Sequence, residues 1–222
     1  MEQRETKSRL GKTIISELPL ILLILGSFAA GALLYDLLPE QMPSHWNISG
    51  EIDGYSSRFW GAFGIPLLNA GVYVMMLILP LIDPRKENYQ KFSGSYRMIR
   101  MVFVVFMTGV YLLVLANTFG AQIPVDRAMM AGISVLFLFL GNYMGQIRHN
   151  YFVGIKTPWT LANEQVWEKT HRFGGRLWVA AGLIGLIASL VGGSWGGILL
   201  GISLGAAVFI PMVYSYIEFK RL

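Results

Sequence analysis

Apolar residues along this chain gather in six long runs, which are separated by short polar stretches. A helix that crosses a bilayer needs about 20 mainly apolar residues, and each run is close to that length. The pattern therefore predicts an all-α membrane protein with six transmembrane helices. Their expected ranges are 18–38, 61–82, 98–119, 123–143, 177–193 and 195–217.

The connections between the runs vary in length, but none of them marks a domain boundary. A first helix pair, 18–82, encloses an outer loop at 38–60. A four-helix portion, 98–217, contains an inner loop at 144–175. We therefore expect a single integral membrane domain over residues 1–222.

A tight turn is predicted between the last two runs, because residues 192–197 are rich in glycine. The two helices on either side must then be antiparallel. Small residues recur in both, and small residues allow membrane helices to approach closely. These residues are Gly182, Gly185, Ala188, Gly197, Gly201 and Gly205.

Composition agrees with a membrane protein. The chain is 54% hydrophobic and 14% charged, whereas a soluble domain carries about 25% charged residues. Its mean hydropathy is +0.52. Cysteine is absent, which excludes disulfides and thiolate chemistry. The lipid bilayer is the first partner that these features predict.

Lysine and arginine are distributed unevenly over the connections. Of the 18, only Arg58 and Arg127 lie in the first, third or fifth connection. The others lie before the first run, in or beside the second and fourth connections, or at the C-terminus. Because cytoplasmic loops carry the excess of basic residues, both termini are predicted to be cytoplasmic. The net charge of +5 is scattered over short loops, which does not favour direct nucleic-acid binding.

The outer loop combines turn signals with aromatic and polar side chains. Pro39 is expected to end the first helix, Pro43 favours an extended chain, and the stretches 47–50 and 53–54 are typical of turns. A small folded hairpin is therefore expected, with a binding surface formed by His45, Trp46, Asn47, Asp53 and Tyr55. One alternative is a metal site at His45, Glu51 and Asp53. Another is that Trp46 and Tyr55 anchor the membrane interface while His45 and Asp53 hydrogen-bond the turns.

The inner loop carries two helix-start signals. Thr157-Pro158 is typical of an N-cap followed by proline, and Asn163-Glu164 offers a second cap. Helical spacing from Glu164 onward predicts a short amphipathic helix on the inner leaflet, with a bend near 174–175 before the fifth span. The residues expected to bind a partner or signal are Asn150, Thr157, Pro158, Trp159, Thr160, Glu164, Trp167, His171 and Arg172.

Motifs for catalysis are weak. The chain lacks a phosphate loop, a serine-nucleophile motif and HExxH, so we predict a protein without enzyme activity, cofactor or metal. One alternative is a metal-dependent membrane enzyme that uses Glu164, Glu168 and His171, because Glu168 and His171 have the spacing of carboxylate metal sites. A second is a transporter of small solutes or lipids, which needs polar groups inside the membrane; its candidates are Asn69, Tyr73, Thr108 and Tyr111.

Two stretches resemble a known family of bacterial membrane proteins. The inner run 150–161, with Glu164, Val166-Trp167 and His171-Arg172, resembles the signature of the SdpI family. The outer run resembles the small domain of unknown function that often precedes that signature. Its matching residues are Leu38-Pro39, Met42-Pro43, His45-Trp46-Asn47, Gly50 and Asp53-Gly54-Tyr55.

The resemblance implies a multi-pass protein of the bacterial plasma membrane that protects a cell against a secreted antimicrobial peptide. It also implies a signalling role, in which the toxin-engaged protein holds a small cytoplasmic repressor at the membrane. In this interpretation the protein binds its partners and does not turn them over. The outer loop would meet the peptide, and the inner loop would meet the cytoplasmic partner.

Overall fold

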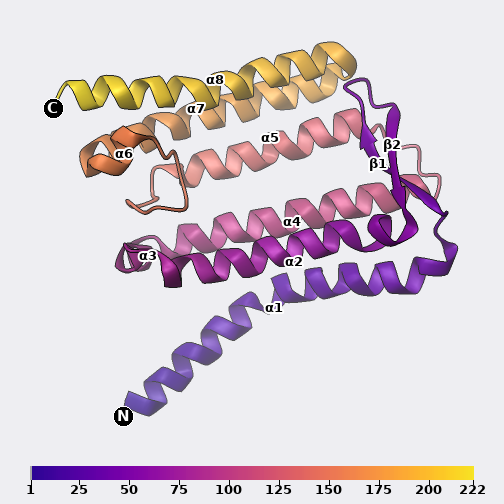
Figure 1. Ribbon diagram of the computed structural model, residues 1–222, viewed down its shortest axis with the longest axis horizontal. Helices are drawn as coiled ribbons and strands as arrows, with labels where there is room; N and C mark the ends of the chain where they lie inside the picture. The colour runs from indigo at the N-terminus through magenta and orange to yellow at the C-terminus, as the bar shows by residue number, and fades with distance from the viewer. Residues whose placement is uncertain (1) are drawn as a thin grey trace.

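The computed structural model describes the backbone of residues 2–222 and the side chains from residue 16 onward. Six long helices run side by side (Figure 1), and each is long and apolar enough to cross a membrane. They confirm the six predicted spans. These helices are α1 (Glu2–Leu34), α2 (Arg58–Ile82), α4 (Ser93–Thr118), α5 (Val125–Met144), α7 (Glu164–Val191) and α8 (Gly193–Lys220).

Four basic residues that contribute to the predicted orientation, Arg4, Lys7, Arg9 and Lys12, lie outside the described side chains. Helices α2, α4, α7 and α8 begin 2 to 13 residues earlier than their apolar runs, as α7 does at Glu164 instead of 177, whereas α5 begins two residues later, at Val125. Apolar runs end where polar residues begin, but the backbone hydrogen bonds of a helix continue through polar residues. Hydropathy therefore predicted the spans and not their ends.

A short antiparallel hairpin caps one end of the helices (Figure 1). After the 3₁₀ helix η1 (Tyr35–Leu37), strand β1 (Gln41–Trp46) pairs with β2 (Ile52–Ser57). The turn is closed by Asn47, whose side-chain oxygen accepts hydrogen bonds from the N–H groups of Ser49 and Glu51 at 2.9 and 3.0 Å. Gly50 follows with φ +84°, a conformation that favours glycine. The predicted folded outer loop is confirmed.

Two short helices lie at the opposite end, beside the C-terminus (Figure 1). Helix α3 (Lys86–Lys91) follows α2, and α6 (Pro158–Ala162) precedes α7. We call this the loop end, formed by residues 83–92 and 145–163. The end that carries the hairpin, the 119–124 connection and the 192–193 turn is called the hairpin end.

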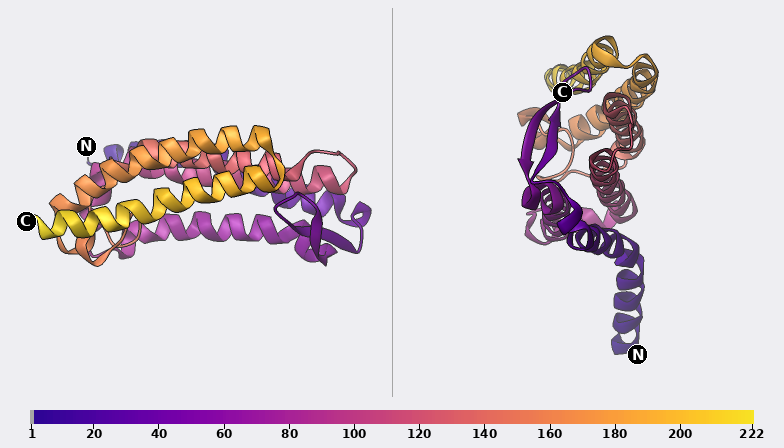
Figure 2. Two further views of the ribbon diagram at one scale, coloured as in Figure 1. Left: turned by 90° about the horizontal axis from the view of Figure 1, so that it is seen from above. Right: turned by 90° about the vertical axis from the view of Figure 1, so that its right-hand side faces the viewer.

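Helices α5, α7 and α8 form a closely packed group (Figure 2). A Cβ atom added to Gly175 of α7 would lie 2.6 Å from the carbonyl oxygen of Gly141 in α5. A Cβ atom added to Gly182 would lie 2.7 Å from the carbonyl oxygen of Ser134, also in α5. The glycines of α7 therefore allow two backbones to touch, as small residues do in membrane proteins.

The prediction of an amphipathic helix on the inner leaflet, with a bend at 174–175, is wrong. Helix α7 is continuous from Glu164 to Val191, and its first turns are packed inside the molecule. Trp167 and His171 are fully buried, because the chain between α5 and α6 covers this face. The helical spacing of these residues reflects a buried face and not a surface that lies on lipid headgroups.

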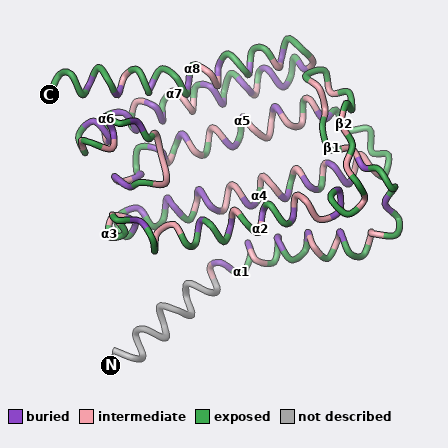
Figure 3. The backbone as a smooth tube through the Cα atoms, viewed as in Figure 1, coloured by how far each residue is buried: buried purple, intermediate pink, exposed green. Residues whose placement is uncertain are grey.

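Helices α1, α2 and α4 form the second group, which meets the first along α4 and α5. Buried residues lie mainly on facing helix surfaces, and exposed ones follow the outer sides of the bundle (Figure 3). The largest cluster of buried apolar side chains lies at the loop end and includes Trp167, Tyr89 and Tyr96. A second cluster lies beneath the hairpin, around Met42 and Tyr111.

Candidate functional site

The hairpin presents an exposed pair of polar contacts. His45 Nδ1 lies 2.5 Å from Asp53 Oδ1 across the two strands. Closer to the tip of the hairpin, Asn47 Nδ2 donates a hydrogen bond to Glu51 Oε2 at 2.9 Å. Tyr55 is 60% exposed and extends from the same hairpin. The hairpin therefore holds a histidine, a carboxylate and an aromatic ring in fixed positions at the surface.

The hairpin is anchored on both helix groups. At its base, Met42 is fully buried and packs where a Cβ on Gly61 of α2 would lie. At its tip, Ser49 Oγ lies 3.1 Å from Ser194 Oγ at the start of α8, and Ile48 packs against Gly197. The β-sheet therefore lies across the ends of α2 and α8, which belong to different groups.

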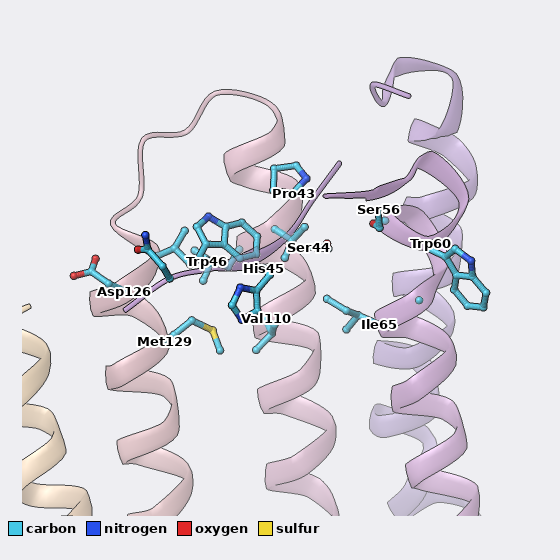
Figure 4. Close-up of a pocket in the computed structure, with 16 residues that line it drawn as sticks. Pro43, Ser44, His45, Trp46, Ser56, Trp60, Ile65, Val110, Asp126 and Met129 are labelled. Atoms are coloured by element: carbon cyan, nitrogen blue, oxygen red, sulfur yellow. The ribbon is translucent and has the colours of Figure 1, made fainter. Parts of the chain in front are cut away.

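A cavity of about 500 Å³ lies beneath the hairpin. Figure 4 shows His45 near Val110 and Met129 in this cavity, with Asp126 to one side. One carboxylate oxygen of Asp126 accepts a hydrogen bond from the Gly193 N–H at 2.7 Å. The lining includes three of the five predicted outer residues, His45, Trp46 and Asn47, while Asp53 and Tyr55 lie outside it.

At the loop end, Asn150 organises the chain that precedes α6. Its side-chain oxygen accepts hydrogen bonds from the N–H groups of Phe152 and Val153 at 2.9 and 2.7 Å. Its Nδ2 donates to the Arg148 and Val153 carbonyl oxygens. Because Asn150 is fully buried, it acts here as a structural centre and presents no surface.

Three rings are stacked behind this loop. The Trp167 ring lies 4.0 Å from that of His171 and 4.9 Å from that of His149, between centroids. Trp167 Nε1 donates to the Ile147 carbonyl oxygen at 2.8 Å. His171 Nε2 accepts from the Ile155 N–H at 2.9 Å, while its Nδ1 lies 2.8 Å from the Trp167 carbonyl oxygen. This pattern fits a neutral His171 with the proton on Nδ1.

The start of α6 is fixed as its sequence indicated. Thr157 and Thr160 form a reciprocal capping box, and Pro158 occupies the first turn. Thr157 Oγ1 also lies 3.0 Å from Ser215 Oγ in α8. Trp159 is half-buried against the Tyr216 ring, at 5.0 Å between centroids. The second expected cap is present too, since the Asn163 side chain accepts from the Gln165 and Val166 N–H groups.

Burial therefore divides the nine predicted inner residues. Asn150, Thr157, Thr160, Trp167 and His171 have at most 3% exposure and build the loop. Pro158, Glu164 and Arg172 are exposed, and Trp159 is half-buried. The residues of this set that can contact another molecule directly are the exposed ones.

Sequence reasoning missed a buried carboxylate at the loop end. Asp83 is 2% exposed, and its Oδ2 accepts from Tyr89 Oη at 3.1 Å and from the Tyr151 N–H at 3.0 Å. Burial, followed by the charge of Asp83, raises the pKa of Tyr89. The sequence did contain a hint of this role. Asp83-Pro84 directly follows an apolar run, and a carboxylate in a short connection can accept hydrogen bonds from nearby N–H groups.

His149 was also missed. Its Nε2 is buried and has no hydrogen-bond partner. Burial, followed by the positive charge of Arg85, lowers the pKa of His149. A polar cavity of about 450 Å³ lies beside it, and its lining also includes Arg85, Lys86 and Glu164.

Three residues of the two metal alternatives, His171, Glu168 and Glu51, have other partners. Both nitrogens of His171 lie within hydrogen-bond distance of backbone atoms, and Glu168 pairs with Arg148 at 2.8 Å. On the hairpin, Glu51 turns to Asn47. Over the residues whose side chains are described, no three acidic or histidine side chains gather as metal ligands would.

The polar groups of the transporter alternative connect helices. Asn69 Nδ2 donates to Thr108 Oγ1 at 3.3 Å, and Tyr111 Oη donates to the Ala62 carbonyl oxygen at 2.9 Å. Tyr73 Oη donates to Glu17 Oε2 at 3.1 Å, and Glu17 in turn pairs with Arg100. These contacts connect α1, α2 and α4.

Comparisons with known proteins match two regions of the chain, and these regions contain the inner loop and the outer loop. Residues 146–215 match the model of the SdpI/YfhL protein family, and residues 22–70 match a domain of unknown function, DUF1648. The chain is 26% identical over 211 residues to Immunity protein SdpI of Bacillus subtilis strain 168, covering 95% of this chain and 97% of that protein. No solved structure matches the chain significantly. This multi-pass bacterial membrane protein is therefore similar to the SdpI family, through the family-model match at residues 146–215 and the likeness to Immunity protein SdpI over nearly its full length.

Proposed function

We propose that this chain is an immunity protein, which binds or senses a secreted antimicrobial peptide at the outer face of the plasma membrane. The observation that carries the proposal is the similarity to Immunity protein SdpI over nearly the full length of both chains. Coverage of that extent includes both the hairpin and the loop end. The proposal is therefore based on the whole molecule and not on one motif.

The hairpin is the proposed contact surface for the peptide. The distribution of lysine and arginine supports a location outside the cell for this hairpin. The His45–Asp53 pair and the exposed Tyr55 ring offer polar and aromatic contacts on a preformed turn. Exposed aromatic residues on rigid elements are frequent anchors of protein interfaces.

The loop end is the proposed output surface. It faces the cytoplasm in the same orientation, so it does not touch an external peptide. Pro158, Glu164, Arg172 and Lys86 are exposed at or beside this end of the molecule. A cytoplasmic repressor or another protein would bind there, and Trp159 would be at the edge of that contact.

Peptide binding can be measured with purified protein and a fluorescently labelled secreted antimicrobial peptide. We expect Tyr55→Ala to weaken binding by about 2 kcal/mol, or roughly thirtyfold in Kd, as for a typical aromatic anchor. Tyr151→Ala, an exposed tyrosine at the loop end, is the matched control and should bind like the parent protein. Equal Kd values for both variants would contradict the assignment of the hairpin.

The relay is tested separately with a transcriptional reporter under the control of the cytoplasmic partner. Trp159→Ala should abolish reporter induction and leave the amount of protein in the membrane unchanged, because Trp159 lies at the surface of α6 and not in the buried stack. Full reporter induction by Trp159→Ala would contradict the assignment of Trp159 to the output surface.

A further inference from the structure

The cavity beneath the hairpin continues along the seam between α4 and α5. A second cavity of about 540 Å³ lies deeper along this seam. The two share Val110, Leu113 and Met129 as lining residues, so they are adjoining parts of one groove. We call it the α4–α5 groove.

The polarity of the groove changes along its length. The deeper part is lined only by apolar residues, among them Val105, Phe106 and Phe139. The part beneath the hairpin adds polar side chains, including His45, Asn47 and Asp126. A groove that is polar at the membrane surface and apolar in the interior matches a molecule with a polar head and a hydrocarbon chain.

The deeper part is open to the bilayer. Val105, Val135 and Phe139 line it and are 51%, 42% and 43% exposed on membrane-spanning helices. Hydrocarbon can therefore reach it sideways, without passing through the protein. Water in the same place would find no hydrogen-bonding side chain in this lining.

The size of the deeper part favours a single chain over a helix. An α-helix with its side chains is about 10–12 Å wide and rises about 5.4 Å per turn. A volume of about 540 Å³ therefore accommodates roughly one helical turn. A hydrocarbon chain is much thinner and can follow the seam along its whole length.

The charge at the polar end favours an ammonium group. Asp126 is the carboxylate that lines the cavity beneath the hairpin. One of its oxygens accepts the Gly193 N–H, and among the described side chains Asp126 forms no ion pair. Trp46 lines the same cavity, and aromatic ring faces also attract cations.

We propose that the α4–α5 groove binds one phospholipid with an ammonium head group, as in phosphatidylethanolamine. The lipid comes from the leaflet at the hairpin end. One of its acyl chains lies between α4 and α5, and its ammonium group lies beside Asp126. This site requires no toxin, so its test does not depend on the immunity function proposed above, although its polar end shares His45 with the proposed peptide contact surface.

Gly109 provides a direct test, because a Cβ at this groove-lining position meets nothing within 4 Å. Gly109→Leu should fill the groove without disturbing the protein. Gly201→Leu on α8 is the matched control, since Gly201 also has open space around it and does not line the groove. Both changes replace glycine by a better helix former.

The proteins are reconstituted in vesicles of equal phosphatidylethanolamine and phosphatidylglycerol, extracted in mild detergent, and weighed by native mass spectrometry. We expect one retained phosphatidylethanolamine on the parent protein and on Gly201→Leu. Gly109→Leu should retain about tenfold less, because the leucine displaces several methylene groups of the acyl chain. Equal retention by the two leucine variants, or no retained lipid on the parent protein, would overturn the proposal.

Asp126→Asn tests the head group. Asparagine keeps an oxygen that can accept the Gly193 N–H, so the turn at the start of α8 is preserved. We expect this variant to retain phosphatidylethanolamine and phosphatidylglycerol equally, whereas the parent protein prefers the former. A parent protein without that preference, or an Asp126→Asn variant that keeps it, would refute the ammonium assignment.

Discussion

At the scale of single residues, the loop end depends on polar groups that have no access to water. Trp167 is stacked between His149 and His171, and burial lowers the pKa of His149. The folded protein therefore favours neutral His149 more strongly than the unfolded chain does. Such a residue contributes stability that is complete above its ordinary pKa of 6.5 and is lost as the pH falls below that value.

This linkage predicts an acid-sensitive fold. The melting temperature of the protein in detergent should fall as the pH is lowered from 7.5 toward about 5, because the unfolded His149 takes up the proton more readily. In His149→Phe, which retains a ring to stack on Trp167, the fall should be smaller. A pH dependence equal in both proteins would show that His149 does not contribute to it.

Asn150 is expected to be the most sensitive polar position at the loop end. In Asn150→Ala the N–H groups of Phe152 and Val153 lose their acceptor. A buried group without its partner costs about 1–3 kcal/mol, so a loss near 3 kcal/mol is expected. Tyr89→Phe, which removes one donor to Asn150 and to Asp83, should cost about 1 kcal/mol. The free energy of unfolding in detergent measures both, and equal losses would contradict this ranking.

At the scale of elements, the contact between α5 and α7 depends on the absence of side chains. A Cβ on Gly175 would collide with the backbone of Gly141, whereas one on Gly201 would meet nothing within 4 Å. We therefore expect Gly175→Leu to separate the two helices and to lower the free energy of unfolding by about 1–3 kcal/mol. Gly201→Leu should leave it nearly unchanged. Similar stability of the two variants would argue against the close contact.

The sequence predicted the elements well where the signal is local. Thr157-Pro158 and Asn163-Glu164 start helices as expected, and the turn at Asn47–Gly50 closes the predicted hairpin. Each of these features depends on hydrogen bonds within a few residues. The length of the apolar runs alone was sufficient to predict the six transmembrane spans.

The sequence failed where a distant segment determines the environment. Trp167 and His171 have helical spacing, and that spacing does not say whether lipid, solvent or protein covers them. The loop that covers them is more than ten residues away in the sequence. Asp83 and His149 were overlooked because each is a single residue in its own connection, and only the folded chain brings the two connections together.

At the scale of the whole molecule, the same two groups of helices are connected at both ends. The hairpin lies across α2 and α8 at one end, and Asp83, Asn88 and Tyr89 reach the 145–157 segment at the other. Binding of a peptide to the hairpin would therefore be able to change the relative position of the two helix groups at the loop end. This arrangement suits a protein that receives a signal on one side of a membrane and reports it on the other.

The orientation can be tested directly, because the chain has no cysteine of its own. Ser49→Cys, at the exposed tip of the hairpin, should react with a membrane-impermeant maleimide on intact cells. Lys156→Cys, exposed at the loop end, should react only after the membrane is permeabilised. The reverse labelling pattern would show that the orientation predicted from the basic residues is wrong.

Protection of living cells is the most direct test of the immunity function. The chain, and a variant with both Asp53→Ala and Tyr55→Ala, are expressed at equal membrane levels in Bacillus subtilis that lacks its own Immunity protein SdpI. Survival is then measured against a panel of secreted antimicrobial peptides. We predict that the parent chain protects cells against at least one of these peptides and that the hairpin variant does not. Killing of both strains by every peptide in the panel would contradict the account.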